Sequence, residues 1–525
     1  TQSDKRILIK ASIVIMLATL LSRVFGLVRM QVINYHFPQE LLDPFWAAYK
    51  IPNTLRELLA EGALSVAFIP VFSACLAKRG VEDASLLASR VLNALVLVVL
   101  AVVGLGILTA PLYMPVYVSG FSTDAVRVAL AVELGQLMMP FLLLASAGAV
   151  VMGVLNGRQH FAAPAFAPVM FSIGMILTVW LFGDRGVYVL GWGVLAGGVL
   201  QLLFQLPFLR GHGIRYTPSL SLRDPGVREV LGLMLPAALA LGVVQLNQLF
   251  VPFFASWNEG GMSALQNAIL LVQMPQGVFA IAISTALLPG LSRQASLGDM
   301  EGFRRGMANG LALVIFFMVP AALFFVFFRV EIVDAIFNLG GKFDAKAVQA
   351  TAESLYWYSL GLIGMGGTVL ANRFFYGMRD TRTPLLVALA SVLVNILCNV
   401  LFHLTIRDTA MIALANSIAV TVNFILLMAI ISRRTGGLDW SLIGRESAKI
   451  LIAASVMSVA VAAVSALFGI PETRTVSFAI LRFGVMLVVA VVSFVAVAAL
   501  LKVGELGEIL SMIRARLGRR GRANP

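Results

Sequence analysis

Two arginines stand close together in the first long apolar stretch of the chain, in the run SRVFGLVR at residues 22–29. Because three residues turn an α-helix by about 300°, Arg23, Gly26 and Arg29 share one arc of roughly 120°. Guanidinium groups bind phosphate or carboxylate groups through paired hydrogen bonds. The run therefore predicts an anion-binding site, with Ser22 beside the arginines and room for a bulky ligand at Gly26.

A second apolar stretch carries a third arginine, Arg56, close to Asn53. We expect Lys50 and Asn53 to contact the same ligand, because both belong to one polar helix face. That face is formed by residues at steps of three and four: Lys50, Asn53, Glu57 and Glu61. We expect gating or structural roles for the acids of this stretch, which are Asp43, Glu57 and Glu61.

The positions of these arginines place them deep in a membrane. Arg23 follows Lys10, and Arg56 follows Asp43, by 13 residues, or roughly 20 Å along a helix. An arginine at this depth costs about 2.5–3.5 kcal/mol, so it should face a bundle interior or a wet cavity. The alternative is that Arg29 and Arg56 only pair with nearby acids to hold helices together. At least four cations face about three acids, however, so we expect positive charge to remain for an anionic ligand.

The composition excludes a soluble protein. Of the 525 residues, 59% are hydrophobic and 12% are charged, whereas soluble proteins carry about 25% charged residues. The net charge of +13 does not indicate nucleic acid, because no basic groove with interleaved aromatic residues is present. The histidines and cysteines are scattered, and no complete nucleotide-binding P-loop occurs. We therefore expect no metal, no cofactor and no enzymatic activity.

Apolar runs that can cross a bilayer, roughly 20 residues each, recur along the whole chain. We predict an all-α polytopic membrane protein of about 14 transmembrane helices, the first of them a retained helix rather than a cleaved signal peptide. The predicted spans are about residues 9–35, 44–76, 88–118, 127–156, 162–182, 187–208, 228–256, 264–291, 304–329, 347–376, 384–406, 410–432, 447–470 and 477–502.

Basic residues alternate between the loops. With the amino terminus inside, 26 of the 39 Lys and Arg residues fall on the cytoplasmic side and 7 on the outer side. This positive-inside pattern predicts that both termini are cytoplasmic. The residues from 504 to 525 form a basic tail that we expect to meet anionic lipid headgroups.

Two segments of the chain recur at a nearly constant distance. Residues 61–73 resemble residues 280–292 at an offset of 219, and residues 157–164 resemble residues 377–384 at an offset of 220. This repeat predicts two six-helix lobes followed by two further helices, with the substrate site between the lobes. The expected boundaries are 1–215 and 216–435 for the lobes, 436–503 for the last two helices and 504–525 for the tail.

The run SRVFGLVR is followed by DPFWAAYKIPNTLRELLAEGALSVAFIPVF at residues 43–72. Further on come MPQGVFAIAISTALLPGLS at 274–292 and FYGMRDTRTP at 375–384. Together these runs closely resemble the MurJ family of lipid II flippases, within the multidrug/oligosaccharidyl-lipid/polysaccharide exporter superfamily. The resemblance covers essentially the whole chain.

This resemblance implies a central cavity and a groove for the lipid tail along the last two helices. It also implies that the chain flips lipid II, the undecaprenyl-pyrophosphoryl disaccharide-pentapeptide, from the inner to the outer leaflet of the bacterial cytoplasmic membrane. The family's cavity arginines correspond to Arg23, Arg29 and Arg56, and its outer-side aspartate corresponds to Asp43. We expect a monomer that uses alternating access, with lipid II and membrane lipids as its partners.

Several positions depart from the family pattern. Met30 stands where an acid is frequent, Glu57 where a basic residue is frequent, and Leu270 where the eighth helix usually carries an arginine. Val251 occupies the position of a sodium-binding aspartate found in some members, so we predict no sodium site of that kind.

Pairs of small or polar residues inside the spans have simpler interpretations. Asn395 and Asn399 could coordinate a cation, but interhelical hydrogen bonding is the better prediction. The Gly-Leu-Gly run at Gly104 and the pair Gly193 and Gly197 predict close helix packing.

Other functions stay open at this point. A cation-coupled drug exporter of the same superfamily would need acidic and aromatic cavity residues instead of surplus arginine. A related polysaccharide-unit flippase should lack the AEGALSVAFIP run at residues 60–70. A polyprenyl-dependent membrane glycosyltransferase would need a large outer loop with catalytic acids, and a non-transporting scaffold gives no reason to bury arginines.

Overall fold

The computed structural model describes residues 2–211, 213–438, 440–468 and 475–507, and for some of these, among them Glu61, only the backbone. These residues form helices joined by short loops and contain no strand. The helices of the first half are α1 Gln2–His36, α2 Gln39–Leu55, η1 Arg56–Ala63, α3 Leu64–Tyr117, η2 Ser119–Phe121, α4 Ala125–Met138, α5 Phe141–Gly157, α6 Ala162–Phe182, η3 Gly183–Arg185, α7 Tyr188–Gly211 and α8 Pro225–Ala255. The others are α9 Gly261–Pro275, η4 Gln276–Ala280, α10 Ile281–Ser296, α11 Met300–Phe337, α12 Ala345–Leu360, α13 Leu362–Gly377, α14 Arg382–Thr405, α15 Ala410–Thr435, α16 Trp440–Leu467 and α17 Val476–Leu500.

Large apolar side chains point outward from these helices. Along α3, Leu105, Leu108 and Leu112 lie on one face and are 64%, 78% and 74% exposed. Among the described residues, 11 helical stretches are long and apolar enough to cross a membrane, and the stretch Gln39–Tyr117 is broken at Gly80. Helix also covers the remaining predicted spans, so the predicted all-α polytopic class with about 14 spans is confirmed.

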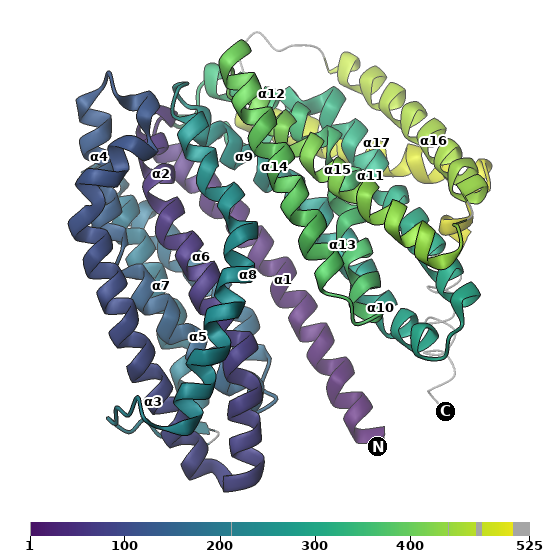
Figure 1. The fold of residues 1–525 in the computed structure, drawn as a ribbon. Helices are drawn as coiled ribbons and strands as arrows, with labels where there is room; N and C mark the ends of the chain where they lie inside the picture. Colours follow the sequence, from purple (N-terminus) through teal and green to yellow (C-terminus); the bar gives the residue numbers. More distant parts are fainter. Residues whose placement is uncertain (1, 212, 439, 469–474, 508–525) are drawn as a thin grey trace, which may run out of the picture. The chain divides into compact units, whose positions relative to one another are not determined.

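The chain divides into two compact units. Unit 1 comprises Thr1–Ser263 and Gly341–Asp344, and unit 2 comprises Ala264–Gly340 and Ala345–Pro525. In unit 1, α3 packs against α5 and α8, and α6 packs between α1 and α7. In unit 2, α11 packs against both α16 and α17 (Figure 1). The domain boundaries expected from the sequence remain predictions, and the basic tail lies outside the described residues from residue 508 onward.

The internal repeat has a structural counterpart in each unit. The π-helix η4, Gln276–Ala280, corresponds at the offset of 219 to residues 57–61, which lie inside the π-helix η1. Gln159 and Arg379, 220 residues apart, both adopt a positive φ, of 57° and 59°. A wider π turn and a left-handed non-glycine residue are each uncommon, so their recurrence at the repeat distance confirms the two pseudo-repeats.

Candidate functional site

The anion site predicted on the first span lies on α1, within unit 1. Arg23 and Arg29 are both partly exposed, as is Ser22. A Cβ atom placed on Gly26 would meet nothing within 4 Å, so the space expected beside this glycine is present.

Arg29 contacts an aromatic ring instead of an acid. Its guanidinium carbon lies 5.5 Å from the centroid of the Phe171 ring on α6, a cation–π arrangement. Its buried Nε atom has no hydrogen-bond partner, and within the described part of the chain Arg29 forms no ion pair. Arg56 from the second stretch lies within electrostatic range of Arg29. Two like charges within range of each other favour an anion between them.

The polar face of the second stretch forms a connected network where α2 passes into η1. Arg56 donates from Nε and Nη2 to Oδ1 of Asn53, at 3.2 and 3.1 Å, and its Nη2 lies 3.5 Å from Oε1 of Glu57. Asn53 in turn donates to Oε1 of Glu57 at 2.9 Å and accepts from the Tyr49 hydroxyl at 3.2 Å. Glu61 belongs to η1, but its side chain is not described.

Two glutamines on α8 complete this network, and the sequence analysis missed both. Gln245 donates to Oε2 of Glu57 at 2.7 Å, and Gln248 accepts from Nζ of Lys50 at 2.5 Å. A signal was present, because the run QLNQ at residues 245–248 interrupts an otherwise apolar helix. What the sequence could not provide was the packing of α8 beside α2 and η1.

The structure therefore brings Arg29, Arg56, Lys50 and Asn53 into one region of unit 1. The ion pair between Arg56 and Glu57 joins neighbouring residues of η1, so it does not support the alternative in which arginines only hold helices together. Arg29 does not fit that alternative either, because its guanidinium group lies over the Phe171 ring and not against an acid. The chemistry available to this region is recognition of a phosphate or carboxylate group.

Asp43 lies apart from this region and is fully buried. Its carboxylate accepts the backbone N–H groups of Gly260, at 2.6 Å, and Ser263, at 3.0 Å. These contacts give Asp43 a capping role at the first residues of α9, while its expected gating role stays a prediction.

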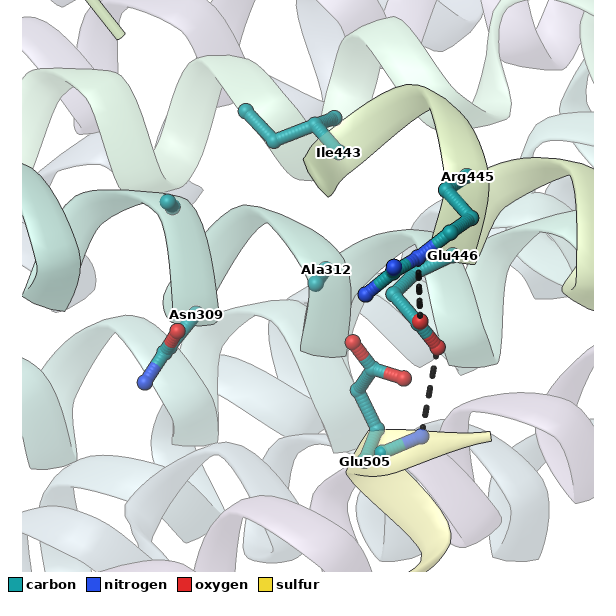
Figure 2. A pocket seen from close by; sticks show the side chains of 8 residues that line it. Asn309, Ala312, Ile443, Arg445, Glu446 and Glu505 are labelled. Atoms are coloured by element: carbon teal, nitrogen blue, oxygen red, sulfur yellow. Dashed lines mark hydrogen bonds and ion pairs between the residues drawn. The ribbon is translucent and has the colours of Figure 1, made fainter. Parts of the chain in front are cut away.

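Unit 2 contains a separate pocket of about 240 Å³ between α11, α16 and the segment after α17 (Figure 2). Its buried Glu446 accepts from Nζ of Lys449 at 2.8 Å and from the backbone N–H of Gly504 at 3.2 Å, and Nε of Arg445 lies 3.6 Å away. These contacts tie the segment after α17 to the start of α16, so we interpret the charged group as structural.

The prediction for Asn395 and Asn399 needs correction. Both side chains are buried, but Asn399 donates to Oδ1 of Asn395 at 2.7 Å and to its carbonyl oxygen at 3.0 Å. The bonds thus run along α14 and not between helices, because residues four apart stack on one helix face. Leu270 is partly exposed on α9.

Comparison with known proteins decides the family. The family model described as lipid II flippase MurJ matches residues 10–484. The chain belongs to the MurJ family. It is 34% identical to the lipid II flippase MurJ of Burkholderia cenocepacia, across 73% of this chain and 76% of that protein. It is 31% identical to the probable lipid II flippase MurJ of Rhizobium tropici, across 98% of this chain and 97% of that protein.

Solved structures share the fold. A lipid II flippase MurJ in an inward closed conformation matches with a TM-score of 0.77 at 24% identity, over 93% of this chain and 98% of that one. An inward-facing multidrug resistance MATE family transporter matches with a TM-score of 0.65 at 15% identity, over 82% of this chain and 99% of that one. The family and the apolar helices make the chain a multi-pass bacterial membrane protein.

Proposed function

We propose that this chain flips lipid II from the inner to the outer leaflet of the bacterial cytoplasmic membrane, with both of its termini in the cytoplasm. Membership of the MurJ family supports this function, as do relatives that are named lipid II flippases. The protein acts as a transporter and makes or breaks no covalent bond in its substrate.

The pyrophosphate of the substrate binds to Arg23, Arg29 and Arg56 in this proposal. The observation that carries it is the state of Arg29, whose Nε lacks a partner while Arg56 lies within electrostatic range. A pyrophosphate supplies the acceptor oxygens and the negative charge that such a pair of guanidinium groups needs. Lys50 and Asn53 take part in the same binding, and the space at Gly26 beside Ser22 admits a bulky headgroup.

The polyprenyl tail stays in the lipid, along a groove formed by the last two helices, while the halves alternate between inward-open and outward-open states. The likeness in fold to transporters solved in inward-facing and inward closed conformations supports this mode. An inside-negative potential then favours outward transfer of the anion, by up to about 2.3 kcal/mol per charge per 100 mV.

Depletion in living bacteria tests the function. When synthesis of this protein is switched off, lipid II should accumulate on the inner leaflet, and the normal chain should reverse the accumulation. The proposed function fails if lipid II still reaches the outer leaflet at the normal rate while no other flippase is present.

A further inference from the structure

Arg56 and Glu57 suggest how the proposed anion site is kept from binding its ligand too tightly. The Nε and Nη2 atoms of Arg56 form the edge of a guanidinium group that best fits two oxygens of a phosphate. In this structure both atoms donate to a single amide oxygen, Oδ1 of Asn53. The nearby carboxylate of Glu57 supplies the opposite charge at 3.5 Å, which is too long for a hydrogen bond.

The Glu57 carboxylate is itself held in place by neutral groups. Asn53 donates to its Oε1 at 2.9 Å and Gln245 donates to its Oε2 at 2.7 Å. The side chain of Glu57 is nevertheless 34% exposed, compared with 18% for Arg56, so it can swing away without unpacking the helix. Lys50 also interacts electrostatically with Glu57.

We propose that Oδ1 of Asn53 and the carboxylate of Glu57 act as an internal substitute for the phosphate. The substrate must displace these oxygen atoms to reach Arg56, while the amide N–H groups of Asn53 stay available to it. Glu57 is then a residue that determines affinity. It weakens binding of any phosphate-bearing ligand and speeds its release, because the carboxylate returns to Arg56 as the phosphate leaves. This inference rests on the proposed function and adds to it a competing group within the chain.

The second repeat provides a natural comparison. Gln276 on η4 stands 219 residues after Glu57, at the same point of the π-helix, and carries no charge. Its neighbour Pro275 stands where unit 1 has Arg56. The pairing of a cation with an internal acid is thus absent from the matching positions of unit 2.

Binding of inorganic pyrophosphate to the full-length protein in lipid nanodiscs tests the inference. Glu57→Gln should bind pyrophosphate about tenfold more tightly than the normal protein, because a repelling charge is removed at short range. Glu57→Asp should stay close to normal. The matched control, Gln276→Ala, should bind pyrophosphate as the normal protein does.

Two further variants separate the possible outcomes. Glu57→Ala removes the same carboxylate and should also tighten binding, which keeps the test decisive if Glu57→Gln does not fold. In an Arg56→Ala background, Glu57→Gln should tighten binding by clearly less than tenfold, because the carboxylate then has no Arg56 to compete for. Binding by Glu57→Gln and Glu57→Ala that is unchanged or weaker would overturn the inference. Binding that does not depend on Arg56 would instead contradict the proposed arginine site.

Discussion

The contacts of Arg29 depend on the planar shape of its guanidinium group as well as on its positive charge. The planar group lies against the Phe171 ring and, in the proposed function, binds phosphate through two donors. Arg29→Lys keeps the charge but loses both properties. We expect the variant to insert normally and to bind pyrophosphate about 10- to 100-fold more weakly, since a lost charged hydrogen bond costs about 1.5–3 kcal/mol. Calorimetric titration measures this change, and equal affinity would argue against the two-donor contact.

Asp43 is a buried acceptor of two backbone N–H groups, so its replacement should affect stability first. Asp43→Asn turns one acceptor oxygen into a donor that faces an N–H group. We expect a loss of about 1–3 kcal/mol in unfolding free energy, visible as a lower melting temperature in detergent. Asp124, the more exposed cap of α4, is the control, because asparagine caps a helix about as well as aspartate. Equal losses at both positions would contradict the argument from burial.

Asp380 forms a pH-sensitive contact in the loop between α13 and α14. The hydroxyl and the backbone N–H of Thr383, together with Arg434, hold the pKa of its carboxyl well below the usual range. A group with a lowered pKa stabilises the fold above its unfolded pKa, about 3.9, and this stabilisation is lost as the pH falls through the folded pKa.

Ionised Asp380 therefore stabilises the fold near neutral pH, and Asp380→Asn should remove this stabilisation. The variant should melt at a lower temperature than the normal protein at pH 7. The difference should stay constant down to about pH 5 and shrink only below about pH 4. Melting curves measured across this range test it, and a difference that already disappears between pH 7 and pH 5 would contradict the assignment.

Close packing between α6 and α7 helps to position the residues around Arg29. The predicted close contact at Gly197 is confirmed, because a Cβ there would lie 2.6 Å from the carbonyl oxygen of Phe171. In the Gly-Leu-Gly run the prediction is confirmed at Gly106, where a Cβ would clash with the side chain of Met139. It is wrong at Gly104, since a Cβ there meets nothing within 4 Å. Gly197 therefore lets α7 approach the part of α6 whose Phe171 ring faces Arg29.

This difference between two helix-interior glycines gives a matched pair of variants. Gly197→Ala should push α6 away, lower the unfolding free energy by about 1–3 kcal/mol and reduce lipid II flipping. Gly104→Ala should be neutral or stabilising by up to about 1 kcal/mol, because alanine favours helix. Melting temperature and flipping are measured for both. A Gly197→Ala protein as stable and active as the normal one would show that the contact does not position Phe171.

For the chain as a whole, the sequence predicted those features that follow from the physical requirements of a membrane. Apolar runs predicted the helical segments, because the backbone of a spanning segment must satisfy its own hydrogen bonds. The cost of a buried charge singled out Arg23, Arg29 and Arg56, and the spacing of the repeat predicted two related halves. The π-helices and the partners of Glu57 and Lys50 were not predictable. The partners of Glu57 and Lys50 come from residues about 190 positions away, such as Gln245 for Glu57, and no local pattern encodes such contacts.

Flipping of lipid II by the purified chain in vesicles tests the central claim most directly. Lipid II is supplied on one leaflet, and its appearance on the other is followed over time. We predict transfer by the normal protein and by Arg305→Ala, which alters an exposed surface arginine. We predict almost no transfer of lipid II by Arg29→Ala or by Arg56→Ala when the levels of folded protein are matched. Normal transfer by both of these variants would contradict the account.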